Sequence, residues 1–160
     1  MQAAEVLKVG EKNKMHAIQK ILTAVDFSGQ TDKVVDAAIS MATKFEAELR
    51  LVFVVEEMAH YAWVTVPHIS FDILEEEMGK SAETKLEKLV EEKLPAGLSC
   101  KTEVRKGIPA REIVDCARKE GSSLIVMGTH GYRGMEKVLL GSVAEQVLRS
   151  APCPVLVINR

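Results

Sequence analysis

Short, nearly continuous apolar runs alternate along this chain with longer segments in which apolar residues recur every three or four positions. The first pattern is typical of buried strands, and the second is typical of helices that lie on a sheet. Strands joined by helical crossovers run parallel, because each crossover returns the chain to the same edge of the sheet. The sequence therefore predicts an α/β domain in which helices cover a parallel sheet.

Five strands are expected from the apolar runs. The second and fourth strands are apolar on both faces, which suits central strands buried under helices. The third alternates polar and apolar residues, as an edge strand does. The five predicted segments are Ile21–Val25, Leu49–Val55, Ser99–Arg105, Leu124–Met127 and Pro154–Ile158.

Four helices are expected between these strands. A long amphipathic helix should run from Phe71 to Lys93, with Glu76 and Lys80 spaced for an i,i+4 ion pair. Pro109 opens the next helix, since a proline in the first turn removes only an N–H that has no helical partner. The last helix should run from Ser142 to Arg149. The apolar stripe of the first helix comprises Val34, Ala38, Met41 and Phe45.

The composition indicates which binding partners and which cellular compartment to expect for this protein. The chain has 160 residues and a net charge of −2, so no overall field attracts it to nucleic acid or to a membrane surface. No apolar run approaches the roughly 20 residues that span a bilayer. Three cysteines without CxxC spacing are typical of reduced thiols in a cytoplasmic protein. We expect a cytoplasmic domain over residues 18–160 that follows an N-terminal arm at residues 1–17, with neither nucleic acid nor membrane as partner.

Two unusual stretches follow the first and fourth predicted strands. Asp26-Phe27-Ser28-Gly29 follows the first, and Gly128-Thr129-His130-Gly131 follows the fourth. Open parallel sheets bind ligands beyond the carboxyl ends of their strands, where the strand order reverses. If the order is 3-2-1-4-5, the first and fourth strands are neighbours. In that order the two stretches form one ligand site.

The glycine-rich stretch has the properties of a phosphate-binding loop. Gly128-x-x-Gly131 is followed by nine residues and then by Gly141-Ser142, where the last helix begins. Glycines allow the backbone to approach an anion closely, and the N–H groups of a helix N-terminus favour phosphate. Arg133 and Lys137 add positive charge between the glycines. Neither GxxxxGK[ST] nor GxGxxG is present, so the stretch is neither a P-loop nor a dinucleotide fingerprint.

These residues carry a resemblance to a known family. Gly128-Thr129-His130-Gly131 with Gly141-Ser142-Val143 resembles the G-x2-G-x9-G-[ST] signature of ATP-binding universal stress proteins. Three further stretches resemble the same family in the same order, so the resemblance extends from about Gln19 to Arg160. It implies a Rossmann-like (adenine nucleotide alpha hydrolase-like), doubly wound sheet of order 3-2-1-4-5 with helices on both faces. The three stretches are Ile21–Ser28, Gly107–Val114 and Pro152–Val157.

The resemblance also implies a stress-response protein that binds ATP, or another adenine nucleotide, with Mg held mainly by the phosphates. It places the adenine against part of the first, second and fourth strands, and the phosphates along the glycine-rich stretch. The implied residues are Ala24, Val54 and Met127 for the adenine; Asp26, Gly128, His130, Gly131 and Arg133 for ribose and phosphates, with Thr129 in the same stretch; and Gly141, Ser142 and Val143 for the terminal phosphates.

Each of these residues also has an interpretation without a ligand. Asp26 can cap the following turn, because aspartate satisfies backbone N–H groups well. Ser142 and Glu145 have the spacing of a capping box. Gly128 and Gly131 can be explained by a tight connection between strand and helix alone. A loop histidine such as His130 is more often a packing residue than a general base.

The last strand suggests how the molecule assembles. Val155–Ile158 is apolar on both faces and lies at an edge in the order 3-2-1-4-5. An exposed apolar edge pairs readily with another chain, and two copies paired antiparallel form a closed dimer. We therefore expect a homodimer, with a further protein partner that is unknown.

Three functions remain open on the sequence. The first is the nucleotide-binding regulatory homodimer, and the second is a dimeric interaction module on the same fold that uses no nucleotide. The third is a slow ATP hydrolase. The sequence contains no apparent nucleophile–base pair or set of metal-binding carboxylates, so we expect at most slow ATP hydrolysis.

Overall fold

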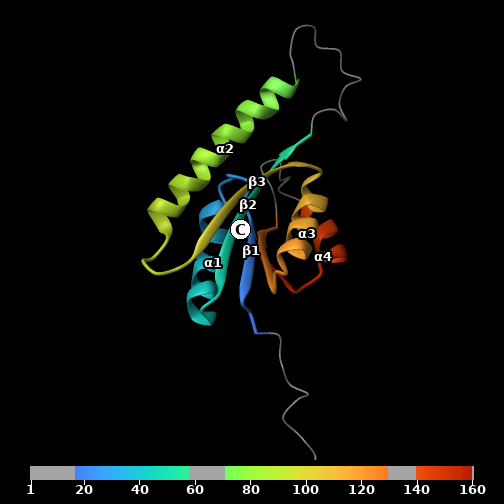
Figure 1. Ribbon diagram of the computed structural model, residues 1–160. Helices are drawn as coiled ribbons and strands as arrows, with labels where there is room; N and C mark the ends of the chain where they lie inside the picture. The colour runs from blue at the N-terminus through green and yellow to red at the C-terminus, as the bar shows by residue number, and fades with distance from the viewer. Residues whose placement is uncertain (1–16, 58–70, 130–139, 160) are drawn as a thin grey trace, which may run out of the picture.

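The computed structural model describes residues 17–57, 71–129 and 140–159. Strands and helices alternate from the first element to the last (Figure 1). Pro109 lies in the first turn of its helix, as expected, and Gly121 ends that helix in the left-handed conformation at φ +65°. The elements are β1 (Lys20–Ala24), α1 (Thr31–Phe45), β2 (Glu48–Glu56), α2 (Phe71–Lys93), β3 (Cys100–Gly107), α3 (Pro109–Glu120), β4 (Leu124–Gly128), α4 (Ser142–Ser150) and β5 (Val155–Ile158).

The strands form one five-stranded parallel sheet in the order β3-β2-β1-β4-β5. The order 3-2-1-4-5 is thereby confirmed, with β1 at the centre. Figure 1 shows α1 and α2 on one face of the sheet, and α3 and α4 on the other. The strand order reverses between β1 and β4, since the chain builds outward from β1 first to one edge and then to the other.

The bounds of β3 differ from the prediction. Its pairing with β2 continues through Val55↔Lys106 and Glu56↔Gly107, beyond the predicted end at Arg105. Hydrogen bonds between backbones, not the alternation of side chains, hold these last pairs. A charged residue therefore continues an edge strand as readily as an apolar one does.

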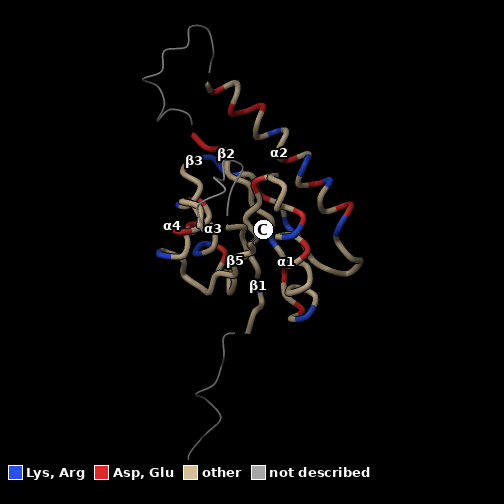
Figure 2. The backbone as a smooth tube through the Cα atoms, turned by 180° about the vertical axis from the view of Figure 1, so that it is seen from behind, with Lys and Arg blue, Asp and Glu red and all other residues tan. Residues whose placement is uncertain are grey.

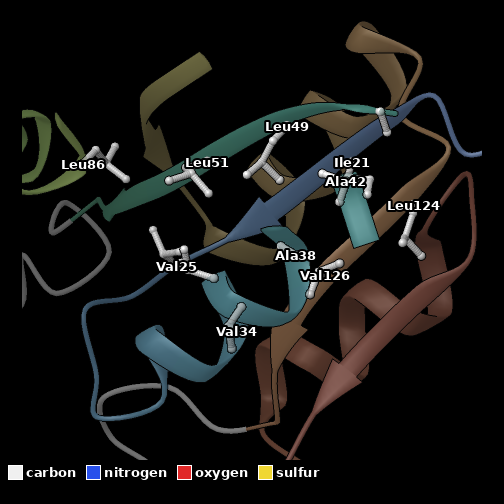
Figure 3. Close-up of a cluster of buried hydrophobic side chains, with 12 residues drawn as sticks. Ile21, Val25, Val34, Ala38, Ala42, Leu49, Leu51, Leu86, Leu124 and Val126 are labelled. Carbon is white, nitrogen blue, oxygen red and sulfur yellow. The ribbon is translucent and has the colours of Figure 1, made fainter. Parts of the chain in front are cut away.

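One hydrophobic cluster fills the space between the sheet and α1 (Figure 3). Ile21, Leu49 and Leu51 point from the strands into this layer and are at most 1% exposed. Val34 and Ala38 meet them from α1, which confirms the predicted stripe at these positions. Phe45, the last residue of α1, is 43% exposed because the stripe ends beyond the packed layer.

A second cluster lies on the opposite face of the sheet, under α3 and α4. Neighbouring residues of β1 divide between the clusters: Ile21 belongs to the first and Leu22 to the second. Side chains alternate between the two faces of a strand, so a strand that is covered by helices on both faces contributes to both layers. β1 therefore lies at the centre of the molecule.

The apolar stripe of α2 is most deeply buried from the middle of the helix onward. Leu86 and Ala82 are at most 3% exposed, whereas Met78, one turn before Ala82 on the same stripe, is 37% exposed. Figure 1 shows the helix continuing past the sheet. Residues of both signs of charge are distributed along the helix (Figure 2), and the predicted Glu76–Lys80 ion pair forms at 2.7 Å.

Candidate functional site

The carboxyl ends of β1 and β4 lie side by side. The register pairs Leu22 with Ile125 and Thr23 with Val126, so both strands end at the same edge of the sheet. Asp26 follows β1 by two residues, and Gly128 ends β4. The strand order thus brings the two stretches that the sequence singled out to the switch point of the sheet, where ligands of such folds bind.

Asp26 organises the turn between β1 and α1. Its Oδ1 accepts hydrogen bonds from the backbone N–H of Ser28 at 3.0 Å and from the hydroxyl of Thr31 at 3.4 Å. Asp26 therefore caps this turn, as one of the two sequence interpretations held. Within the described part of the chain both bonds use Oδ1, so this role is compatible with a ligand contact through the other oxygen.

Phe27 holds a backbone conformation that is uncommon for a side-chain-bearing residue, at φ 56°. Its ring centroid lies 5.0 Å from that of Phe53 in β2, and Lys85 Nζ from α2 lies 5.3 Å from the Phe27 centroid. The contacts with Phe53 and Lys85 help to hold this conformation beside Asp26. Sequence reasoning missed this arrangement, because nothing in the sequence pairs Phe27 with residues so far along the chain.

The residues implied for the adenine meet in one apolar cluster. Met127 is 5% exposed in the cluster under α3 and α4, and Ala24 and Val54 pack against it, partly buried. Val143, implied for the terminal phosphates, joins the same cluster from α4. Four elements thus contribute one apolar wall directly below the edge where Asp26 and Gly128 lie.

Thr129 connects the end of β4 to the start of α4. Its N–H donates to the Ile158 carbonyl at 2.9 Å, and its carbonyl accepts from the N–H of Gly141 at 2.6 Å. The beginning of α4 is therefore fixed against the ends of β4 and β5. His130, Gly131 and Arg133 lie outside the described residues, as does Lys137.

The capping box predicted for Ser142 and Glu145 is wrong. Gly141 is the N-cap of α4, and no side chain of the described residues caps this helix, while Ser142 is already its first residue. A capping box needs the serine at the N-cap, where its hydroxyl reaches the third helical N–H. Glu145 instead pairs with Arg149 at 2.7 Å. The first turn of α4 thus carries backbone N–H groups that no side chain of the described residues caps, which suits an anion.

The cysteines are not activated nucleophiles. All three are free, and burial raises the pKa of Cys100 and of Cys116 to about 11. A thiol with such a pKa stays protonated at neutral pH and is a poor nucleophile. Among residues 17–57, 71–129 and 140–159, no group of three acidic, histidine or cysteine side chains is placed to hold a metal ion. The same residues include no helix long and apolar enough to cross a membrane.

Comparisons with known proteins identify the family. A family model described as the universal stress protein family matches residues 17–159. Universal stress protein MJ0531 of Methanocaldococcus jannaschii is 37% identical over 155 residues, which cover 93% of this chain and 86% of that protein. The solved structure of MJ0577 from the same organism is similar with a TM-score of 0.77 at 30% identity, over 90% of this chain and 97% of that one.

A universal stress protein from Archaeoglobus fulgidus, solved in complex with dAMP, shares the fold with a TM-score of 0.57 at 23% identity, over 89% of this chain and 98% of that one. The resemblance noted in the sequence is confirmed by the family match and by the relatives together. The chain belongs to the universal stress protein family.

Proposed function

We propose that this protein is a cytoplasmic, stress-response homodimer that binds ATP at the edge where β1 and β4 end. The observation that carries the proposal is the convergence of Ala24, Val54 and Met127 in one apolar cluster at that edge. A purine base needs an apolar wall with a few polar groups at its rim. Asp26 and the start of α4 supply the polar groups.

The phosphates fit the first turn of α4. Gly141 and Ser142 open this helix, and no side chain in the described part of the chain caps it, so backbone N–H groups are available to an anion. The partly buried Gly141 has an extended backbone at φ −73° and ψ 156°, which turns the chain into the helix. Mg²⁺ bound to the phosphates would neutralise their charge, and the protein itself would supply the base wall and the helix N-terminus.

The family supports this proposal at the level of the fold. The relative from Archaeoglobus fulgidus holds dAMP, so the architecture accommodates an adenine nucleotide. The residues of the glycine signature are present in this chain from Gly128 to Val143. We expect at most slow hydrolysis of ATP, and we assign the protein a regulatory role in which the bound nucleotide is a signal.

Calorimetric titration with ATP, with and without Mg²⁺, tests this function. Wild type is expected to bind with micromolar affinity, and Gly131→Val is expected to abolish binding by blocking the approach of backbone to phosphate. Gly79→Val is the matched control, because Gly79 lies on α2 and a Cβ there meets no atom within 4 Å. Circular dichroism checks that both variants fold.

No binding by wild type below millimolar concentration would overturn the proposal. The interaction module without nucleotide would then be the better description. Sustained ATP turnover that disappears in Asp26→Ala would instead identify an enzyme.

A further inference from the structure

Three buried polar side-chain atoms lack a hydrogen-bond partner in the described part of the chain, and all belong to β1 and the start of α1. They are Thr23 Oγ1 and both polar atoms of the Gln30 amide. These two residues flank Asp26 in the sequence, three positions before it and four after it. A buried polar group without a partner destabilises the folded state, so its presence beside a candidate site calls for a reason.

The backbone of Gln30 is held against the Asp26 turn. Its N–H donates to Ser28 Oγ at 3.3 Å, and the N–H of Ser28 donates to Asp26 Oδ1 at 3.0 Å. The Gln30 carbonyl accepts from the N–H of Val34 at 3.1 Å, inside α1. The backbone of Gln30 is therefore hydrogen-bonded, whereas its side-chain amide has no partner among the described residues, although Gln30 is only 8% exposed.

Gln30 occupies the N-cap of α1 without capping it. No side chain of the described residues makes the cap hydrogen bond there. A methionine of similar length would avoid the unpartnered amide. The glutamine gives no such benefit to the folded protein alone. A ligand that pairs with the amide would supply one.

The chemistry of the amide indicates which part of a nucleotide it fits. The amide has an N–H₂ donor and a carbonyl acceptor, and both lack partners, so the argument does not depend on which atom is which. A phosphate oxygen only accepts at neutral pH, and so satisfies the donor alone. A ribose carries two neighbouring hydroxyls, each of which both donates and accepts.

We infer that the Gln30 amide is a further contact of the nucleotide and hydrogen-bonds to the ribose hydroxyls. The inference rests on the proposed function, and it adds a residue that makes the site selective for ribose over deoxyribose. Because both amide atoms are covered in the structure, the contact forms in the bound state, after neighbouring side chains have moved. The stability lost in the free protein is then recovered on binding.

The test compares ATP, 2′-deoxyATP and 3′-deoxyATP in titrations of wild type and Gln30→Met. Wild type is expected to bind at least one deoxy analogue about three- to tenfold more weakly than ATP, as the loss of one hydrogen bond implies. Gln30→Met is expected to bind ATP more weakly by a similar factor and to discriminate less against the deoxy analogue that wild type binds more weakly. Its thermal midpoint without ligand should exceed that of wild type.

Thr23→Val is the matched control, because Thr23 is the other residue with an unpartnered buried group, and its 0% exposure places it inside the sheet layer. This variant should keep the affinity for ATP and the discrimination against the deoxy analogues. Equal binding of all three nucleotides by wild type overturns the inference and leaves the proposed function standing. A Gln30→Met variant that discriminates against the deoxy analogues as strongly as wild type also overturns the inference. A wild type that binds none of the three overturns both.

Discussion

Gly107 ends β3 in a conformation that few other residues adopt. Its φ is +146°, and a Cβ at this position would lie 2.9 Å from Glu112 Oε1. The Glu112 carboxylate also accepts a hydrogen bond from Arg105 Nε at 2.8 Å. The missing side chain of Gly107 therefore makes room for an ion pair that ties the start of α3 to β3.

Gly107→Ala should lower the free energy of unfolding by about 1–3 kcal/mol, because the new Cβ strains the backbone and displaces Glu112. Urea denaturation measures this loss. Gly121→Ala is the control: its φ is +65° and no atom lies within 4 Å of its Cβ, so only the left-handed backbone contributes, at about 1 kcal/mol. Equal losses in the two variants would show that contact with Glu112 has no part in the effect.

Charged side chains, in addition to the apolar cluster, join β2, β3 and α3 on the α3 face of the sheet. Arg50 of β2 bonds Glu103 of β3 at 2.8 Å and Glu120 of α3 at 2.7 Å. Arg105 bonds the same Glu103 at 2.8 Å, and through Glu112 it reaches α3 as well. Glu103 therefore accepts from two guanidinium groups and lies at the centre of the network.

The pH dependence of stability should reflect this network. Burial opposes ionisation of Glu103, but the hydrogen bonds and charges of Arg105 and Arg50 outweigh burial and lower its pKa below the ordinary value of 4.5. The folded protein therefore holds the proton less tightly than the unfolded chain does. This contribution is present above about pH 4.5 and is lost as pH falls through the lower pKa of the folded state.

Glu103→Gln should lower the free energy of unfolding at pH 7 by about 1–3 kcal/mol, because it leaves two partly buried arginines with a weaker acceptor. It should also flatten the loss of stability between pH 5 and about pH 3. Glu76→Gln, which breaks an exposed pair on α2, is the control and should change stability by less than about 0.5 kcal/mol. A Glu103 variant with the acid profile of wild type would contradict this account.

The sequence predicted which segments become strands because the runs in β2 and β4 are apolar on both faces. It predicted the order 3-2-1-4-5 only through the family resemblance, since the apolar runs alone leave that order open. The end of β3 was not predictable, because backbone pairing carries the strand through the charged Lys106. Local patterns report burial, whereas pairing depends on the neighbouring strand.

The candidate site was predictable to a similar degree. Asp26 and Gly128 were found because they follow apolar runs. The capping box failed because the backbone of Gly141, fixed by Thr129, sets the start of α4. The unpartnered amide of Gln30 left no trace in the sequence, since a missing partner is a property of three-dimensional packing.

The two edges of the sheet differ in how readily a strand of another chain can pair with them. β5 bonds β4 on one side, and no described strand bonds its other side. Leu156 and Ile158 pack with the cluster under α1, and Val155 packs with the other cluster. Among the described residues, Val157 is the side chain of β5 that joins neither. It is therefore the position where a change most directly tests the proposed dimer.

Val157→Lys should convert the dimer to a monomer, because a charge on a pairing edge opposes strand addition. Light scattering coupled to size-exclusion chromatography measures the mass of each species. Leu148→Lys is the control, because Leu148 is already 44% exposed on α4. A wild type that elutes with the mass of one chain, or a Val157→Lys variant that keeps the mass of two, would contradict dimerisation through β5.

The opposite edge sets a limit on assembly. β3 is eight residues long, and four of these residues are charged: Lys101, Glu103, Arg105 and Lys106. Two copies joined through β5 would form one continuous sheet with a β3 strand at each end. Charged edges of this kind resist further strand addition. If the protein pairs through β5, assembly would stop at two copies, because the β3 edges resist further pairing. The proposed dimer would thus be protected from growing into fibres.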